Sequence, residues 1–219
     1  MAENKIRRYT VGEEIFNGVS HGIGALLSIG GTVILIVLSV LYGDHTALAS
    51  SIIYGSSLII LYTMSTLYHS ITSEIAKKVL RVFDHTSIFI LIAGSYTPFC
   101  LIALDGNKKA LAVVIVVWIC AIIGIVLNAI SLEKTEKFSL ILYVAMGWAI
   151  VVVFKQIVEA LPTPAFWLLL LGGISYTGGI LFYKMKKIKY MHGIWHLFVL
   201  LGSLLHYLCI VIYVLPMSY

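Results

Sequence analysis

The sequence predicts an all-α membrane protein, a bundle of seven transmembrane helices with a cytoplasmic N-terminus and an extracellular C-terminus. Its 219 residues are 60% hydrophobic and only 11% charged, whereas soluble domains carry about 25% charged residues. The mean hydropathy is +1.01. Long apolar runs follow one another along the chain with short polar turns between them. This pattern excludes a soluble enzyme, a nucleic-acid binder, a disordered chain and a fibrous protein.

Each apolar run is long enough to cross a bilayer, which takes about 20 helical residues. The runs are continuously apolar rather than alternating, so they indicate helices and not the strands of a membrane barrel. We expect a short cytoplasmic N-terminus (1–15), a seven-helix domain (16–214) and a short external tail (215–219), with no separate soluble domain. The predicted spans are residues 16–42, 46–70, 83–104, 110–130, 138–161, 165–183 and 190–214.

Polar or helix-breaking residues account for each end of a run. The separators are, in chain order, the turn 43–45, a basic loop with Lys77, Lys78 and Arg81, the turn 105–109, the charged loop 133–137, the prolines Pro162 and Pro164, and the basic run 184–189. The apolar part of the first run is longer than the roughly 7–15 residues of a cleaved signal peptide, and acidic residues precede it. The three cysteines (Cys100, Cys120 and Cys209) lie in apolar runs, so we expect free thiols rather than a disulfide framework.

Basic residues give the expected orientation. Seven crossings place twelve of the fifteen Lys and Arg residues on the N-terminal side. The other side has Lys108 and Lys109, with Lys155 late in the fifth run. Because cytoplasmic loops are enriched in Lys and Arg, the N-terminus is predicted to be cytoplasmic. The twelve are Lys5, Arg7, Arg8, Lys77, Lys78, Arg81, Lys134, Lys137, Lys184, Lys186, Lys187 and Lys189.

Four clusters of polar residues interrupt the apolar runs. A charge at mid-bilayer costs about 2.5–3.5 kcal/mol even on insertion scales, so such residues indicate a functional site. Each cluster lies at the start of an odd-numbered span or the end of an even-numbered one. The predicted topology therefore places all four at one depth near the inner leaflet. They are Glu14, Asn17 and His21; Ser65 and His69; Asp84 and His85; and His192 and His196.

The spacing of two histidines predicts a metal site. His192 and His196 are four residues apart and share one face of a helix. Two such imidazoles make half of a divalent metal site, which a third from another helix would complete. Three histidines and a water are a catalytic zinc arrangement, although copper, nickel and iron stay open. Asp84 suits a carboxylate that contacts the bound water, and Ser65 suits a hydrogen bond to a ligand or substrate.

Structural interpretations of the same residues stay open. A single His-x-x-x-His pair is common in helices, Asp84 suits the N-cap of the third helix, and Ser65 suits helix packing. We interpret Glu14, Asn17 and His21 as an inter-helix network rather than as ligands. His206 lies ten residues beyond His196, about 15 Å along a helix. It is therefore predicted to be a hydrogen-bonded core group, while His45 is expected in solvent and His85 at the interface.

Together, these motifs resemble the hemolysin III branch of the progestin and adipoQ receptor family, which includes the adiponectin receptors. The resemblance is carried by Glu14-x-x-Asn17-x-x-x-His21, by Ser65-x-x-x-His69, by Asp84-His85 leading into residues 93–98, and by His192-x-x-x-His196 with His206 ten residues on. It implies a seven-helix bundle in the cell membrane with zinc near the cytoplasmic leaflet. The implied ligands are His69, His192 and His196, with Asp84 reaching the zinc-bound water and Ser65 beside the site.

The resemblance leaves the activity open between three hypotheses. A wider hydrolase superfamily with this pattern includes ceramidases, which implies hydrolysis or sensing of a lipid amide or ester. Bacterial members are named for haemolysis, which implies a pore-forming cytolysin whose metal is structural. A regulator of membrane fluidity with structural zinc is the third. Membrane lipid is the expected partner, and a homo-oligomer stays open. His85 stands where the adiponectin receptors have tyrosine, so the ligand biology of those receptors does not carry over to this chain.

Overall fold

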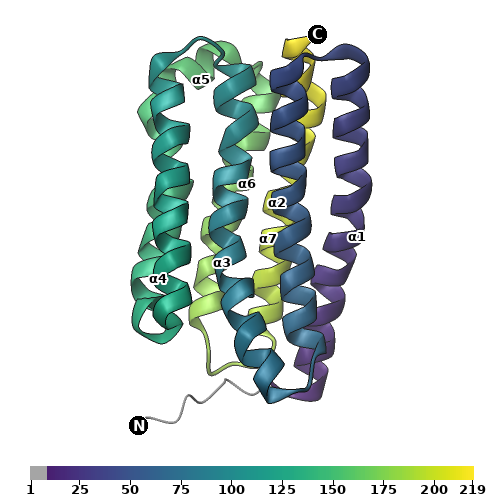
Figure 1. The fold of residues 1–219 in the computed structure, drawn as a ribbon, viewed down its shortest axis with the longest axis vertical. Coiled ribbons are helices and arrows are strands. Elements are labelled where there is room, and N and C mark those ends of the chain that lie inside the picture. The colour runs from purple at the N-terminus through teal and green to yellow at the C-terminus, as the bar shows by residue number, and fades with distance from the viewer. Residues whose placement is uncertain (1–8) are drawn as a thin grey trace.

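A computed structural model describes residues 9–219 as a bundle of long helices that run nearly parallel to one another (Figure 1). Lys5, Arg7 and Arg8 of the predicted N-terminal segment lie outside the described residues. The helices are α1 (Val11–Tyr42), α2 (His45–Ser70), α3 (Glu74–Pro98), α4 (Lys108–Gly147), α5 (Phe154–Ala160), α6 (Thr163–Lys184) and α7 (Met191–Cys209). Short π-helical segments continue α3 (Phe99–Ala103) and α7 (Ile210–Val214). 3₁₀ turns occupy Ala149–Val153 and Leu215–Ser218.

Six segments of the described chain are long and apolar enough to cross a membrane. They are Val11–Tyr42, His45–Ser70, Glu74–Ala103, Lys108–Ala160, Thr163–Lys184 and Met191–Ser218. The predicted spans 110–130 and 138–161 both fall within the fourth segment, which has 53 residues. The other five predicted spans each correspond to one segment.

The fourth segment reverses direction at Ser131. This residue has extended backbone angles (φ −161°, ψ 91°) inside α4. The Oγ atoms of Ser139 and Thr135 both donate hydrogen bonds to Oδ1 of Asn128, at 2.6 and 2.8 Å. Eleven residues of straight helix would separate Asn128 and Ser139 by about 16 Å. The short contact is therefore possible only because the two parts of α4 fold back on each other.

Polar residues between the apolar runs begin the helices by capping their free N–H groups. Thr10 and Glu13 form a capping box at α1, with the backbone N–H of Thr10 donating to Oε2 of Glu13 at 2.9 Å. Asp44 Oδ1 accepts the N–H of Ala47 at 2.7 Å at the start of α2. Asn107 caps α4 in the same way.

The third helix begins earlier than predicted. It starts at Glu74, so Lys77 and Arg81 lie on its opening turns and not in a loop. Long basic side chains can keep their charge in water while their stems lie along a helix, which lets α3 extend beyond the hydrocarbon. Asp84 lies ten residues inside α3 and is buried. The alternative that it caps this helix is wrong.

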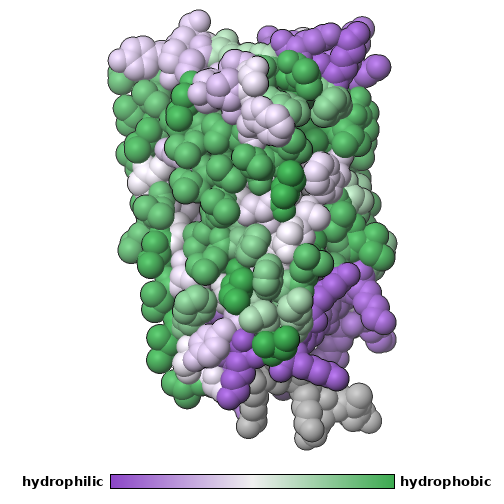
Figure 2. Space-filling view, turned by 180° about the vertical axis from the view of Figure 1, so that it is seen from behind, coloured by the Kyte–Doolittle hydropathy of each residue, from purple (hydrophilic) through white to green (hydrophobic). Residues whose placement is uncertain are grey.

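The surface is apolar and the interior holds many polar groups. Apolar side chains cover the middle of the face in Figure 2, and hydrophilic ones gather toward its two ends. Leu26 is 73% exposed and Ile141 is 69% exposed, whereas Asn17 and His196 are buried. Apolar side chains on the outside and polar ones inside are stable when the surrounding solvent is lipid. The chain is therefore a multi-pass membrane protein.

The three cysteines are free thiols. Cys100 and Cys209 are buried, and Cys120 is half-buried.

Candidate metal centre

Three buried histidines from two helices converge at one end of the bundle. His69 lies in the last turn of α2, and His192 and His196 lie in the first two turns of α7. Each offers one ring nitrogen, and these nitrogens all lie within 4.8 Å of one another. The histidines therefore form a group that can hold a metal ion.

Glu14 orients the ring of His69. Its Oε2 lies 2.6 Å from Nδ1 of His69. An ionised carboxylate only accepts hydrogen bonds, so Nδ1 carries the proton and Nε2 keeps its lone pair. Nε2 is buried and has no hydrogen-bond partner in the described part of the chain. A carboxylate behind the imidazole is the usual support of a metal-binding histidine.

Ser20 orients the ring of His196, and here too Nδ1 carries the proton. Ser20 Oγ donates to the carbonyl of Asn17 at 3.0 Å and lies 3.2 Å from Nδ1 of His196. Since its proton goes to Asn17, Ser20 accepts the Nδ1 proton of His196, which leaves a lone pair on Nε2. This Nε2 is also buried without a hydrogen-bond partner among residues 9–219. His21 stacks on His196, with ring centroids 3.5 Å apart and an interplanar angle of 10°.

These lone pairs fit a metal ion. A buried acceptor without a partner costs about 1–3 kcal/mol. Nε2 of His69 and Nε2 of His196 are both buried acceptors without a partner among the described residues, and the two histidines belong to the group whose ring nitrogens cluster. A divalent cation bound by neutral imidazoles would satisfy both atoms, and all-nitrogen ligation suits zinc.

Close packing of α1 on α7 positions the histidines. A Cβ atom on Gly193 would lie 2.2 Å from the ring of Phe16 and 2.8 Å from Oδ1 of Asn17, so only glycine fits at this position of α7 without a shift. The chain enters α7 through Tyr190, whose φ is 64°. The N–H of Tyr190 donates to Oε1 of Glu13 at 3.0 Å, which ties the start of α7 to the start of α1.

An ion pair joins α3 to the same cluster. Lys77 Nζ lies 2.5 Å from Oε1 of Glu14, whose other oxygen contacts His69. Glu14 therefore links α1, α2 and α3, and α3 also carries Asp84.

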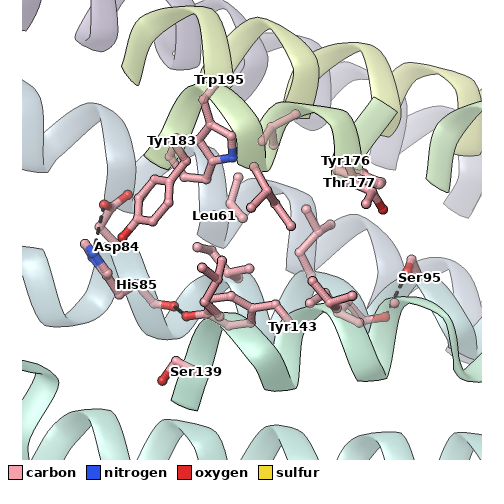
Figure 3. A pocket seen from close by; sticks show the side chains of 18 of the residues that line it. Leu61, Asp84, His85, Ser95, Ser139, Tyr143, Tyr176, Thr177, Tyr183 and Trp195 are labelled. Carbon is pink, nitrogen blue, oxygen red and sulfur yellow. Dashed lines mark hydrogen bonds and ion pairs between the residues drawn. The ribbon is translucent and has the colours of Figure 1, made fainter. Parts of the chain in front are cut away.

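An elongated cavity of about 150 Å³ extends from this centre between α3, α4, α6 and α7. Its lining includes His192 at one end and His206 at the other, and these residues are fourteen positions, or about 21 Å, apart along α7. In Figure 3, Asp84, His85 and Tyr183 surround one end, and Ser95 and Thr177 lie at the other. The middle is lined mostly by aliphatic and aromatic side chains. The cavity is thus polar at its ends and apolar between them.

The structure brings most predicted site residues to this end of the bundle. Glu14 and Asn17 contact His69, and His21 contacts His196. Ser65 lies one turn before His69 and is buried, and its Oγ has no hydrogen-bond partner in the region described.

Three other predicted polar residues lie apart from the three clustered nitrogens. Asp84 lines the cavity with His192, and its carboxylate lies 3.5 Å from Nδ1 of His85. His206 lies at the far end and donates from Nε2 to the carbonyl of Leu169 at 3.1 Å.

Sequence reasoning missed several residues that support the site. Ser20 adjoins His21 and lies three residues after Asn17, a spacing that could have identified it. The sequence pattern places Lys77 in a basic loop and Glu13 in the polar N-terminal segment, with no indication that either supports the site. A further group, Tyr183 and Lys186 around Glu136, closes the polar end of the cavity. No signal in the sequence joins these distant residues.

The fold and the site define a class: a multi-pass helical membrane protein in which the ring nitrogens of three buried histidines cluster at one end of the bundle. Residues 9–207 match the family described as Haemolysin-III related, and the chain belongs to that family.

Similar proteins come from bacteria and mammals. The chain is 42% identical to Hemolysin-3 of Bacillus cereus over 214 residues, which cover 97% of each chain. It is 42% identical to the Hemolysin-3 homolog of Bacillus subtilis (strain 168) over 205 residues, 94% of this chain and 96% of that one. It is 28% identical to the human monocyte to macrophage differentiation factor over 208 residues, 90% of this chain and 83% of that one. The resemblance predicted from the motifs is confirmed.

Proposed function

We propose that this protein is a zinc-dependent membrane hydrolase that cleaves an amide or ester bond of a membrane lipid. The single observation that carries the proposal is a buried group of three histidines, one of which, His192, lines a cavity that also holds a carboxylate. A centre that only needed to stabilise the fold would be closed by four protein ligands. Here, three histidine nitrogens cluster without a carboxylate among them in the described chain.

His69, His192 and His196 would hold the metal. Bound zinc supplies Lewis-acid chemistry, because it polarises a carbonyl and lowers the pKa of a bound water to about 7. Asp84, buried on the wall of the same cavity, accepts the proton of the attacking water and returns it to the leaving group. Ser65 does not line this cavity, but its Oγ is buried one turn before His69 without a hydrogen-bond partner in the described chain, so it would hydrogen-bond a ligand of the metal.

The shape of the cavity supports a lipid substrate. Ile88, Ile92 and Val144 line its middle, and polar side chains stand at the end near His192. An amphiphile would place its apolar chain along the aliphatic wall and its amide or ester near the histidines. Since the outside of the bundle is apolar, such a molecule would enter laterally from the bilayer.

We further propose seven crossings with the histidine group near the cytoplasmic leaflet. The Lys108–Ala160 segment would be about 80 Å long as a straight helix, far more than the roughly 30 Å of a hydrocarbon core, and it reverses at Ser131. Twelve described Lys and Arg residues divide unequally between the ends of the bundle. The histidine end has Lys77, Lys78, Arg81, Lys134, Lys137, Lys184, Lys186, Lys187 and Lys189, and the other end has Lys108, Lys109 and Lys155. This supports a cytoplasmic location for the site.

Elemental analysis and a lipid cleavage assay test the function together. Protein purified in detergent should contain one zinc per chain and release fatty acid from labelled ceramide-like lipids or lipid esters. His192→Ala should lose both the zinc and the turnover. His45→Ala is the matched control, because His45 is exposed at the opposite end of the bundle and should keep both. Absence of zinc, or turnover that survives His192→Ala, would refute the proposal. Stoichiometric zinc without turnover on any lipid would favour a lipid sensor.

The names of the bacterial relatives support a second candidate, a pore-forming cytolysin with a structural metal. Dye release from proteoliposomes separates it from the hydrolase. A pore would release dye equally with the wild-type chain and with a His69→Ala variant that folds but lacks zinc. A hydrolase would release no dye from vesicles that contain no substrate.

A further inference from the structure

A second cavity reaches the histidine group from another side. It has a volume of about 720 Å³ and lies between the first turns of α1, the end of α2 and the start of α3. Its lining includes His69 and Glu14, whereas the elongated cavity is lined by His192 and His21. The two cavities share no lining residue among those described. The histidine group therefore separates two cavities of different character.

The lining of the second cavity suits a hydrated cation. Glu14, Glu74 and Ser70 line it together with Lys77, so carboxylate and hydroxyl groups form part of its wall. Its rim includes Thr72 and Glu74, which are exposed at the histidine end of the bundle. The elongated cavity instead has an apolar middle, and moving an ion through apolar surroundings costs far more free energy than moving it along polar groups.

Tyr9 lies where the second cavity meets the ligands. Its ring centroid is 5.6 Å from that of His69 and 5.1 Å from that of His192, and its side chain lines the cavity. The ring of Tyr9 therefore lies beside two of the three imidazoles at the wall of this cavity. His69 itself lines the cavity, and its Nε2 is buried without a hydrogen-bond partner in the described chain.

We infer that the metal ion enters and leaves its centre through the second cavity, past Tyr9, while the elongated cavity serves the lipid. This inference rests on the proposed zinc centre. Separate routes mean that zinc exchange and lipid occupancy do not compete for the same space.

The rate of zinc loss to excess chelator tests the route in the full-length chain in detergent. Thr72→Trp and Ile71→Trp place an indole in the second cavity at positions outside the helices. Each should slow zinc release several-fold while one zinc per chain is kept. Tyr9→Ala should speed release. Ile180→Trp is the matched control, since it fills the elongated cavity and should leave the rate unchanged.

The outcomes separate this inference from the proposed function. Slower release in Ile180→Trp, with normal release in both second-cavity variants, would assign the ion to the elongated cavity and overturn the inference. Unchanged release in all four variants would overturn it as well. In both cases the zinc centre itself would stand. A wild-type chain without zinc would instead overturn the centre, and the route with it.

Discussion

The carboxylate of Glu14 accepts a hydrogen bond from Nδ1 of His69 across 2.6 Å, so a residue of α1 orients a predicted metal ligand on α2. The same carboxylate binds Lys77 on α3 at 2.5 Å. One acidic side chain therefore joins the three helices that surround one side of the centre. These two contacts are what the acidic side chain contributes at the edge of an apolar span.

Removal of Glu14 should weaken metal binding without abolishing it. In Glu14→Ala, the ring of His69 loses its orienting partner, and the affinity for zinc is expected to fall about 10–100-fold. Chelator competition measures the change. Glu133→Ala is the control, because Glu133 is 51% exposed and pairs only loosely with Arg81, at 3.9 Å. Equal affinities for both variants would contradict the role of Glu14.

A methyl group at Gly193 should disturb the centre through packing. Gly193→Ala places Cβ 2.2 Å from the ring of Phe16 and 2.8 Å from Oδ1 of Asn17, so these α1 side chains, or α1 itself, must shift. Such overpacking typically costs about 1–3 kcal/mol, and we expect both a lower unfolding temperature and weaker zinc binding. Gly173→Ala on α6 is the matched control, since a Cβ there meets nothing within 4 Å. If the two variants melt alike, the close approach of α1 and α7 is not needed.

Substitution of Asp84 should separate catalysis from metal binding. Asp84→Asn keeps the shape of the side chain but removes the proton acceptor, so lipid turnover is expected to fall by about 10²-fold or more. The zinc content should stay at one per chain, in contrast to His192→Ala. Asp105→Asn, in the exposed turn at the other end of the bundle, controls for the loss of one charge. Loss of zinc from Asp84→Asn would indicate that Asp84 is itself a ligand.

The reversal at Ser131 should depend on Asn128. Asn128→Ala leaves the hydroxyls of Ser139 and Thr135 without their shared acceptor, and a buried polar group without its partner costs about 1–3 kcal/mol. We expect a lower unfolding temperature with unchanged zinc content. Lys134→Ala, an exposed position in the same hairpin, should melt like the wild type. A wild-type melting temperature for Asn128→Ala would show that the hairpin does not rely on these bonds.

Much of the site was predictable from the spacing of residues along single helices. His192 and His196 are one turn apart, so any helix places them on one face, and the structure clusters them with His69. Ser20 was not predictable as the partner of His196, because the contact joins residues 176 positions apart. The same holds for Glu13 and the N–H of Tyr190. Such contacts depend on how α1 packs on α7, which no local pattern encodes.

The sequence by itself determined that this chain lies in a membrane, where its apolar runs are, and which histidines share a helix face. Those properties follow from transfer free energy and helical periodicity, which act on neighbouring residues. Only the tertiary structure decided that α3 begins at Glu74, that the chain reverses at Ser131, and that Asp84 lies on a cavity wall rather than at a helix end. These features depend on contacts between helices. The residues that make such contacts are far apart in the sequence, so no local pattern predicts them.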